Sequence, residues 1–162
     1  AQVSHEYLIE QVQDQSITAS ATQSELNFNH PVKELIFAGN WSGGALAAVT
    51  TTNATTDTLH LKLNGHDRFA PRPMEYFSRA QVWQHHTGEG GFLPNTIAVY
   101  SFALKPEEHQ PSGTCNFSRI DNAQVILQGT GHTFNTTSSN VYAVNYNVLR
   151  IMSGMGGLAY SN

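Results

Sequence analysis

The sequence predicts an all-β fold, an antiparallel β-sandwich with long connecting loops and little helix. Segments in which apolar and polar residues alternate recur along the chain, about eight in all, and this period of two is typical of half-buried strands. Several connections exceed a tight hairpin, which favours a Greek-key sandwich over an up-and-down barrel. Charged residues make up only 12% of the chain, about half the usual quarter. The polar surface therefore consists mainly of Ser, Thr, Asn and Gln.

The first half of the chain contains predicted strands at residues 6–13, 25–29, 32–38 and 58–63. The first alternates imperfectly, which is compatible with a β-bulge. The second ends at His30-Pro31, because the residue before a proline is restricted to extended backbone. The fourth alternates cleanly, and we expect His60 and Lys62 to face solvent while the leucines between them face the core. Asn64-Gly65 then predicts a tight turn.

The second half contains predicted strands at residues 96–104, 117–128 and 141–151, and one or two helical turns within residues 74–82. Tyr100, Phe102 and Leu104 alternate with small or polar residues, so we expect them on one face of their strand. Pro106 ends that strand because proline lacks the donor N–H. Pro111-Ser112-Gly113 is typical of a turn in which glycine adopts a positive φ.

Two long polar segments, residues 41–56 and 129–140, carry no strand pattern. Connections of this length are often functional or face a partner, and we expect these two to face outward or toward neighbouring molecules. Three Asn-x-Ser/Thr sequons fall in predicted loops, and their asparagines are candidate glycosylation sites: Asn40, Asn53 and Asn135. A fourth sequon, at Asn116, lies at the start of a predicted strand and is a poorer candidate.

Length, charge and cysteine content exclude several classes of protein. A chain of 162 residues suits one domain. It can bury roughly 70% of its unfolded surface, so it needs no disulfide or structural metal to be stable. The net charge is −4 and the eight Lys and Arg are scattered singly, which disfavours nucleic-acid binding. Cys115, the single cysteine, excludes an internal disulfide and a cysteine-based zinc site, and we expect a buried thiol. No apolar run approaches the ~20 residues of a membrane-spanning helix.

Patterns that would carry catalysis or bind a metal are lacking. His85 and His86 are adjacent, so on a strand they would point to opposite faces and could not share a metal. Glu107-Glu108-His109 follows a proline and is typical of a solvated turn. Ser112-Gly113 does not match a nucleophile elbow. We therefore predict no catalytic residue, no metal and no cofactor, in a protein that is not an enzyme.

Four sequence blocks carry a resemblance to a known family: KPEEHQPSGTCNFSRIDNA at residues 105–123, YAVNYNVLRIMSGMGGLAYSN at 142–162, HEYLIEQ at 5–11 and LNGHDRF at 63–69. Together they resemble the major capsid proteins of large icosahedral DNA viruses, above all those that infect algae and protists. The blocks are spread over nearly the whole chain, so the resemblance is far more specific than a short motif.

The resemblance implies a single jelly-roll domain over residues 1–162, similar to the second of two tandem jelly rolls. The first is not present in this chain, and the absence of an initiating Met also predicts a piece of a longer polypeptide. In the family such proteins form trimeric, pseudo-hexagonal capsomers in the outer icosahedral shell of the virion. The implied partners are further copies of the same protein, neighbouring capsomers and minor capsid proteins, with no direct nucleic-acid contact and no membrane insertion.

Aromatic residues in predicted loops are the candidate contacts between domains or subunits in such an assembly: Phe69, Tyr76, Phe77, Trp83 and Phe92. The alternative is that these side chains cover the ends of their own sandwich.

Two other functions stay open at this stage. A jelly-roll carbohydrate-binding module would stack Trp41 or Trp83 on sugar rings, although the sequence lacks a repeated aromatic platform and an acidic calcium cluster. A cupin-like metalloenzyme is disfavoured because the H-x-H spacing of its metal ligands is absent.

Overall fold

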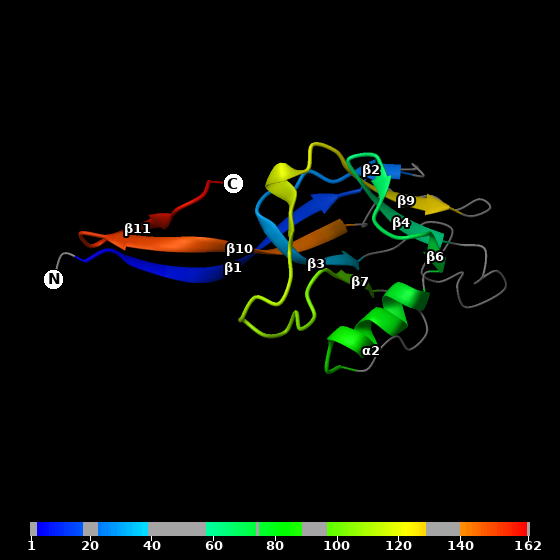
Figure 1. The fold of residues 1–162 in the computed structure, drawn as a ribbon, viewed down its shortest axis with the longest axis horizontal. Coiled ribbons are helices and arrows are strands. Elements are labelled where there is room, and N and C mark those ends of the chain that lie inside the picture. Colours follow the sequence, from blue (N-terminus) through cyan, green and yellow to red (C-terminus); the bar gives the residue numbers. More distant parts are fainter. Residues whose placement is uncertain are drawn as a thin grey trace.

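The computed structural model describes residues 3–17, 23–38, 58–73, 75–88, 97–128 and 140–161. In this part of the chain two antiparallel sheets pack against each other (Figure 1) in the predicted jelly-roll β-sandwich. Most neighbouring strands are distant in sequence. The sheets are therefore built by long crossing connections, as the sequence predicts, rather than by successive hairpins.

Sheet A has six strands within the described residues, in the order β1-β10-β3-β7, with β11 beside β10 and β8 beside β3. The strands are β1 (His5–Ser16), β3 (Pro31–Ala38), β7 (Ile97–Ser101), β8 (Cys115–Asn116), β10 (Asn140–Met152) and β11 (Met155–Leu158). The ends of β3 and β10 differ from the predicted segments by one residue or less, because their alternation is clear on both faces.

Sheet B has five strands within the described residues, in the order β2-β9-β4-β5, with β6 also beside β4. They are β2 (Gln23–Glu25), β4 (Thr58–Leu63), β5 (His66–Asp67), β6 (Arg72–Pro73) and β9 (Ala123–Gln128). β4 coincides with the predicted segment. The strands beyond the expected eight include β5, β6 and β8, which are only two residues long.

The predicted helical segment forms as a π-helical part, η2 (Tyr76–Ala80), continued by α2 (Gln81–His85). It packs against β7, the outermost strand of the sheet A path. The Gln81 Oε1 atom accepts a hydrogen bond of 3.2 Å from the backbone N–H of Ser101 on that strand. The helix thus satisfies a donor at an edge that would otherwise be open to pairing.

The core lies between the two sheets and takes apolar side chains from both. Fully buried members include Leu35 and Phe37 from β3, and Leu59 and Leu61 from β4. Burying one such side chain stabilises the fold by about 1.5–3 kcal/mol relative to leaving it exposed. Cys115 lies half-buried against this cluster, and burial raises the pKa of its thiol.

A β-bulge at Lys33 shifts the pairing of β3 with β10. Val144 lies opposite Glu34 and Asn145 lies opposite Val32, so Lys33 has no opposite residue. Val32 and Leu35 both reach the core although they are three residues apart. Lys33 and Glu34 consequently both project from the outer face of sheet A, the face away from the core.

The same bulge explains why the predicted strand 96–104 ends early. The Lys33 carbonyl accepts hydrogen bonds from two successive N–H groups, Phe102 at 2.9 Å and Ala103 at 3.3 Å. Because one carbonyl takes two donors, the alternation of side chains is lost after Ser101. The prediction that Leu104 shares one face of the strand with Tyr100 and Phe102 is wrong, since β7 ends at Ser101 and the Leu104 side chain is 76% exposed.

The tight turn at Asn64-Gly65 and the positive φ of Gly113 follow the prediction. Asn64 and Gly65 both have positive φ values, 51° and 80°, between β4 and β5. Gly113 has a φ of 148°, and a Cβ atom there would lie 2.6 Å from the carbonyl oxygen of Phe102. Glycine is therefore required at 113 both for its backbone conformation and for the close approach.

Three local predictions need correction. His60 is buried rather than solvent-facing, and its Nε2 atom lies 3.6 Å from the Asp67 carboxylate across the β4–β5 hairpin. The strand predicted over residues 117–128 begins only at Ala123, because the 3₁₀ turn η3 (Phe117–Arg119) precedes it. Of the strand predicted over residues 25–29, only Glu25 is paired, as the last residue of β2, because side chains of β1 bond the Asn27 and Asn29 N–H groups.

Candidate assembly surface

Sheet A extends beyond the sandwich as a ribbon, which Figure 1 shows as β1 and β10 running side by side with β11 along β10. Every residue of β1 pairs with β10, from His5 opposite Ile151 to Ser16 opposite Asn140. We call β1, β11 and the part of β10 paired with β11 the terminal ribbon. Its exposed apolar side chains include Tyr7, Leu8, Met152, Met155 and Leu158. A narrow ribbon with exposed apolar residues is marginally stable alone, which points to a missing partner surface.

The outer face of sheet A carries apolar side chains along β1 and the residues of β10 opposite them. Leu8 lies opposite Val148, Val12 lies opposite Val144, and all four side chains belong to the face away from the core. Val12 is 64% exposed. The solvent-exposed face of an antiparallel sheet usually carries polar side chains. These apolar positions are therefore better suited to contact with another domain or subunit than to solvent.

Glutamine side chains of β1 tie it to the segment that follows β2. The Gln15 Oε1 atom accepts from the Asn27 N–H at 2.7 Å, and the Gln13 Oε1 atom accepts from the Asn29 N–H at 3.0 Å. These side chains occupy the donors that a neighbouring strand would otherwise bind. Residues 26–29 are therefore extended next to sheet A without pairing as a strand, although Leu26 and Phe28 enter the core.

Two buried asparagines of β10 continue this amide network. Asn145 donates to the Gln13 Oε1 atom at 3.0 Å and to the Asn29 carbonyl at 3.2 Å. Asn147 donates to the Gln11 Oε1 atom at 3.0 Å and to the Tyr160 carbonyl at 2.9 Å. Since Tyr160 follows β11, the network fixes the base of the terminal ribbon to the sandwich through hydrogen bonds rather than apolar packing.

Charged groups cover the outer face where the bulge lies. The buried Lys33 ammonium bonds the Glu10 carboxylate and lies 5.3 Å from the ring centroid of Tyr146. The His109 Nδ1 atom lies 3.5 Å from the same carboxylate, and the Tyr146 hydroxyl donates to the His109 carbonyl at 3.4 Å. Residues 102–113, which we call the cover loop, are therefore held over this part of sheet A.

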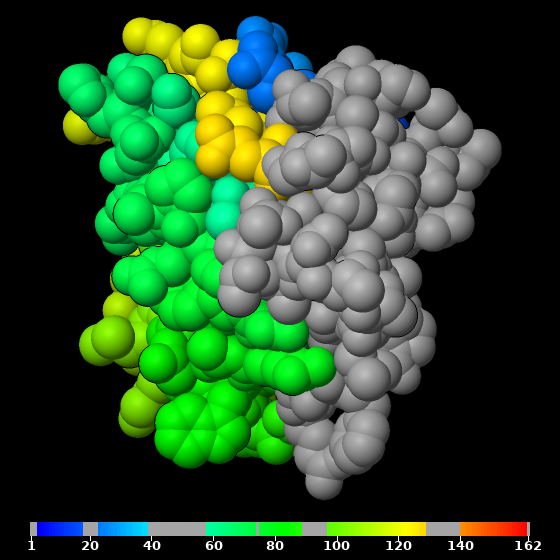
Figure 2. Space-filling model, turned by 90° about the vertical axis from the view of Figure 1, so that its right-hand side faces the viewer, coloured from blue at the N-terminus to red at the C-terminus, as the bar shows by residue number. Residues whose placement is uncertain are grey.

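The predicted contact aromatics divide into two groups. Phe77 is completely buried, and Phe69 and Tyr76 pack against the same core, with the Phe69 ring centroid 4.7 Å from that of Tyr100. The alternative, that these side chains cover the end of their own sandwich, therefore describes Phe77. Trp83 on α2 is 82% exposed, and α2 stands on the surface away from the terminal ribbon (Figure 1, Figure 2). Phe92 lies outside the described residues.

The three candidate glycosylation sites, Asn40, Asn53 and Asn135, also lie outside the described residues, as do most of the long segments 41–56 and 129–140. Asn116 is exposed in β8, and its Oδ1 atom accepts a hydrogen bond from the Ser118 N–H at 3.1 Å. The fourth sequon is thus part of a local turn at the start of η3.

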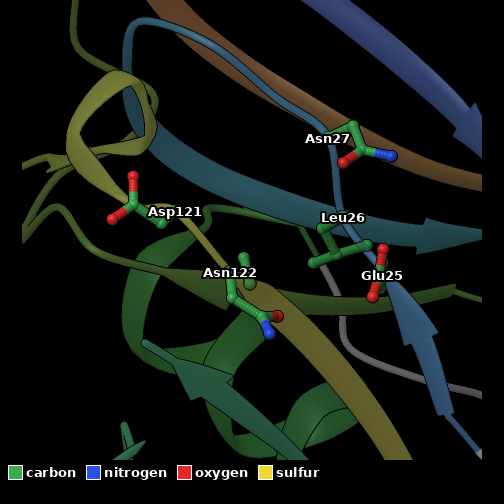
Figure 3. A pocket seen from close by; sticks show the side chains of 6 residues that line it. Glu25, Leu26, Asn27, Asp121 and Asn122 are labelled. Carbon is green, nitrogen blue, oxygen red and sulfur yellow. The ribbon is translucent and has the colours of Figure 1, made fainter. Parts of the chain in front are cut away.

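A polar hollow lies between the segment after β2 and the start of β9 (Figure 3). It is lined by Glu25, Leu26, Asn27, Asp121, Asn122 and Ala123. Its volume of about 100 Å³ is well below the roughly 300 Å³ at which ligand pockets begin. The exposed Trp83 is not part of it, so the hollow does not combine an aromatic platform with a sugar-sized pocket.

Within the described residues, no group of three or more His, Cys, Asp and Glu side chains could hold a metal ion. The same part of the chain contains no helix that is long and apolar enough to span a membrane. Among those residues the terminal ribbon and the outer face of sheet A provide extended surfaces for contact.

The two-sheet sandwich and its crossing connections define the class, a jelly-roll domain, and the exposed apolar residues of the ribbon are those of a domain that packs against others. The family model described as large eukaryotic DNA virus major capsid protein matches residues 1–157. The chain belongs to this family.

Relatives and a solved structure agree with this assignment. The chain is 53% identical to the major capsid protein of Pyramimonas orientalis virus and 41% identical to that of Paramecium bursaria Chlorella virus 1. These matches cover all of this chain but only 44% and 50% of the two relatives. The quasi-atomic model of the PBCV-1 virus capsid superimposes with a TM-score of 0.77 at 37% identity, over 99% of this chain and 52% of that one. The chain thus spans about half the length of the relatives it matches.

Proposed function

We propose that this chain is one jelly-roll half of a major capsid protein, which packs beside a second jelly roll and trimerises into pseudo-hexagonal capsomers. The terminal ribbon carries this proposal, because Tyr7, Met155 and Leu158 are left exposed on strands that need a partner. The relatives are about twice as long as this chain, which leaves room for a second domain of similar size. Obligate interfaces of this type bury roughly 2,000–5,000 Å².

The proposed role is mechanical rather than catalytic, and its place is the outer icosahedral shell of the virion. The partners are further copies of the same protein, neighbouring capsomers and minor capsid proteins. Trp83, far from the ribbon, would then face a neighbouring subunit or capsomer, since a large exposed aromatic side chain is a typical interface anchor. Glycosylation at Asn40, Asn53 or Asn135 stays a prediction, and an intact mass equal to the sequence mass would remove it for the sample measured.

Light scattering on a size-exclusion column tests the proposal. The 162-residue chain is measured over a concentration series, alone and mixed with the part of the Pyramimonas orientalis virus capsid protein that it does not match. We expect concentration-dependent association of the chain alone and a stable complex in the mixture. A chain that stays monomeric at every concentration and ignores the other part would contradict the proposal, and binding on a glycan array by that monomer would favour a carbohydrate-binding module.

A further inference from the structure

His86, directly after α2, lies between two carboxylates from other parts of the fold. Its Nε2 atom is 2.6 Å from the Glu34 Oε2 atom, and its Nδ1 atom is 3.1 Å from the Glu107 Oε1 atom. Glu34 lies on β3 and is buried, while Glu107 lies at the surface of the cover loop. These three side chains join the end of the helix, sheet A and the cover loop at one point.

If both contacts of His86 are hydrogen bonds, the three side chains together must carry one proton more than a neutral imidazole and two carboxylates do. A carboxylate only accepts hydrogen bonds, and a neutral imidazole has one donor and one acceptor nitrogen. Both ring nitrogens of His86 face carboxylate oxygens at bonding distance. Either both nitrogens of His86 are protonated or the Glu34 carboxyl is. In both cases one proton lies between the Nε2 atom and the Glu34 Oε2 atom.

Charged and polar groups surround these three side chains. Burial raises the pKa of the Glu34 carboxyl, and the charges of His86, Lys33 and His85 counteract that rise. Glu107 accepts hydrogen bonds from the Thr87 N–H at 3.0 Å and from the Thr87 hydroxyl, which lower the pKa of its carboxyl. Lys33 itself bonds Glu10 on β1, with His109 beside it. Lys105 and Glu108 pair with each other in exposed positions of the cover loop.

We propose that Glu34, His86 and Glu107 form a proton-dependent clasp, which holds the cover loop and the end of α2 on the outer face of sheet A and releases them as the pH rises above neutrality. The two bonds of the closed clasp need a proton that a histidine in the unfolded chain, with an ordinary pKa of about 6.5, gives up as the pH rises. Stability therefore falls as the pH rises, because the folded state binds more protons than the unfolded state. The clasp adjoins Lys33 and Glu10, so its state controls how the outer face is presented to neighbouring domains.

Hydrogen exchange of single amides, measured by NMR on the 162-residue chain between about pH 6 and pH 9.5, tests the clasp. The reporter amides are Thr87 and Lys105, whose N–H groups bond Glu107 and the Ser112 hydroxyl. The reference amides are Leu26 and Arg68, which bond backbone carbonyls near sheet B. After correction for intrinsic base catalysis, we expect protection of the reporters to fall about tenfold or more across this range while the references keep theirs.

Variants distinguish opening of the clasp from a general loss of protection in the folded chain at high pH. His86→Gln should remove the pH step at the reporters and leave them weakly protected at every pH. Glu107→Gln, at an exposed position that tolerates change, should do the same if His86→Gln does not fold. Glu108→Gln is the matched control on the next residue and should keep the step. A step that persists in the His86 or Glu107 variant, or reporter protection that never changes with pH in the unmodified chain, would overturn the proposal.

Discussion

The sandwich body and the terminal ribbon use the same sheet in opposite ways. In the body, apolar side chains of sheet A and sheet B meet each other, and Leu35 and Leu61 are almost completely buried. In the ribbon, Met155 is 75% exposed. Its strands are joined to the body by hydrogen bonds that the Gln13 side chain accepts and the Asn147 side chain donates. The body buries its own apolar side chains, whereas the ribbon leaves its apolar side chains exposed, which is the basis of the proposed contact with a partner.

The largest difference in stability between the two regions is expected when one leucine in each is shortened to alanine. Leu61→Ala in β4 should lower the free energy of unfolding by about 2–5 kcal/mol, because it leaves a cavity in a packed core. Leu158→Ala in β11 is the matched control, and its exposed side chain predicts a change within about 0.5 kcal/mol. Urea unfolding followed by tryptophan fluorescence and circular dichroism measures both. Equal losses in the two variants would mean that the ribbon is part of the same packed unit.

A smaller loss is expected at the junction between the two regions. Gln13→Ala removes the acceptor of the exposed Asn29 N–H and one of the two acceptors of the buried Asn145 amide, and an unsatisfied buried donor costs about 1–3 kcal/mol. Hydrogen exchange at Asn29 and along the base of β1 should rise in this variant. Asp14→Ala, the neighbouring exposed position, should leave both stability and exchange unchanged. No difference between the two variants would show that the amide network does not anchor the ribbon.

A pH effect confined to the body should be smaller again. Burial lowers the pKa of the His60 imidazole, so the folded state binds fewer protons at this site than the unfolded chain. This stability is present above the unfolded pKa of about 6.5 and is lost as the pH falls through the folded value. His60→Gln should flatten the acid side of the stability profile measured by urea unfolding. The exposed His66→Gln is the control, and an equal flattening there would argue against burial as the cause.

Replacing exposed apolar residues of the terminal ribbon should change stability least and self-association most. Met155→Ser with Leu158→Ser should leave the unfolding transition nearly unchanged, since both side chains are exposed. The same pair of changes should reduce binding of the dye ANS and shift the chain toward monomer in light scattering. The exposed pair Lys105→Ser with Glu108→Ser serves as a control of the same size. Unchanged dye binding in the ribbon variant would place the apolar contact surface elsewhere.

Local alternation predicts most of the sandwich and fails where distant residues intervene. β4 and β10 follow directly from their period of two. The bulge at Lys33 is invisible in the sequence of β7, yet it decides that Leu104 points to solvent. Likewise, the glutamines of β1 determine that residues 26–29 do not pair as a strand. These contacts join positions separated by ten or more residues, which no local pattern contains.

The assembly surface was only partly predictable. Phe77 and Trp83 lie in one helical segment, and only its packing against β7 makes the first buried and the second exposed. The ribbon escaped sequence reasoning, although a signal was present. Leu8 and Val12 alternate with acidic residues at 6, 10 and 14 on one face of β1, and apolar side chains among charged ones on the outward face of a strand indicate a contact surface.

The central claim is that another part of the capsid protein covers the terminal ribbon and the outer face of sheet A. Hydrogen–deuterium exchange of the 162-residue chain, alone and mixed with the unmatched part of the Pyramimonas orientalis virus protein, tests it most directly. We expect protection to increase in β1, in β11 and at the outer end of β10, and to stay unchanged in the core strand β4. Protection that appears elsewhere while the ribbon exchanges as fast as in the free chain would contradict the account.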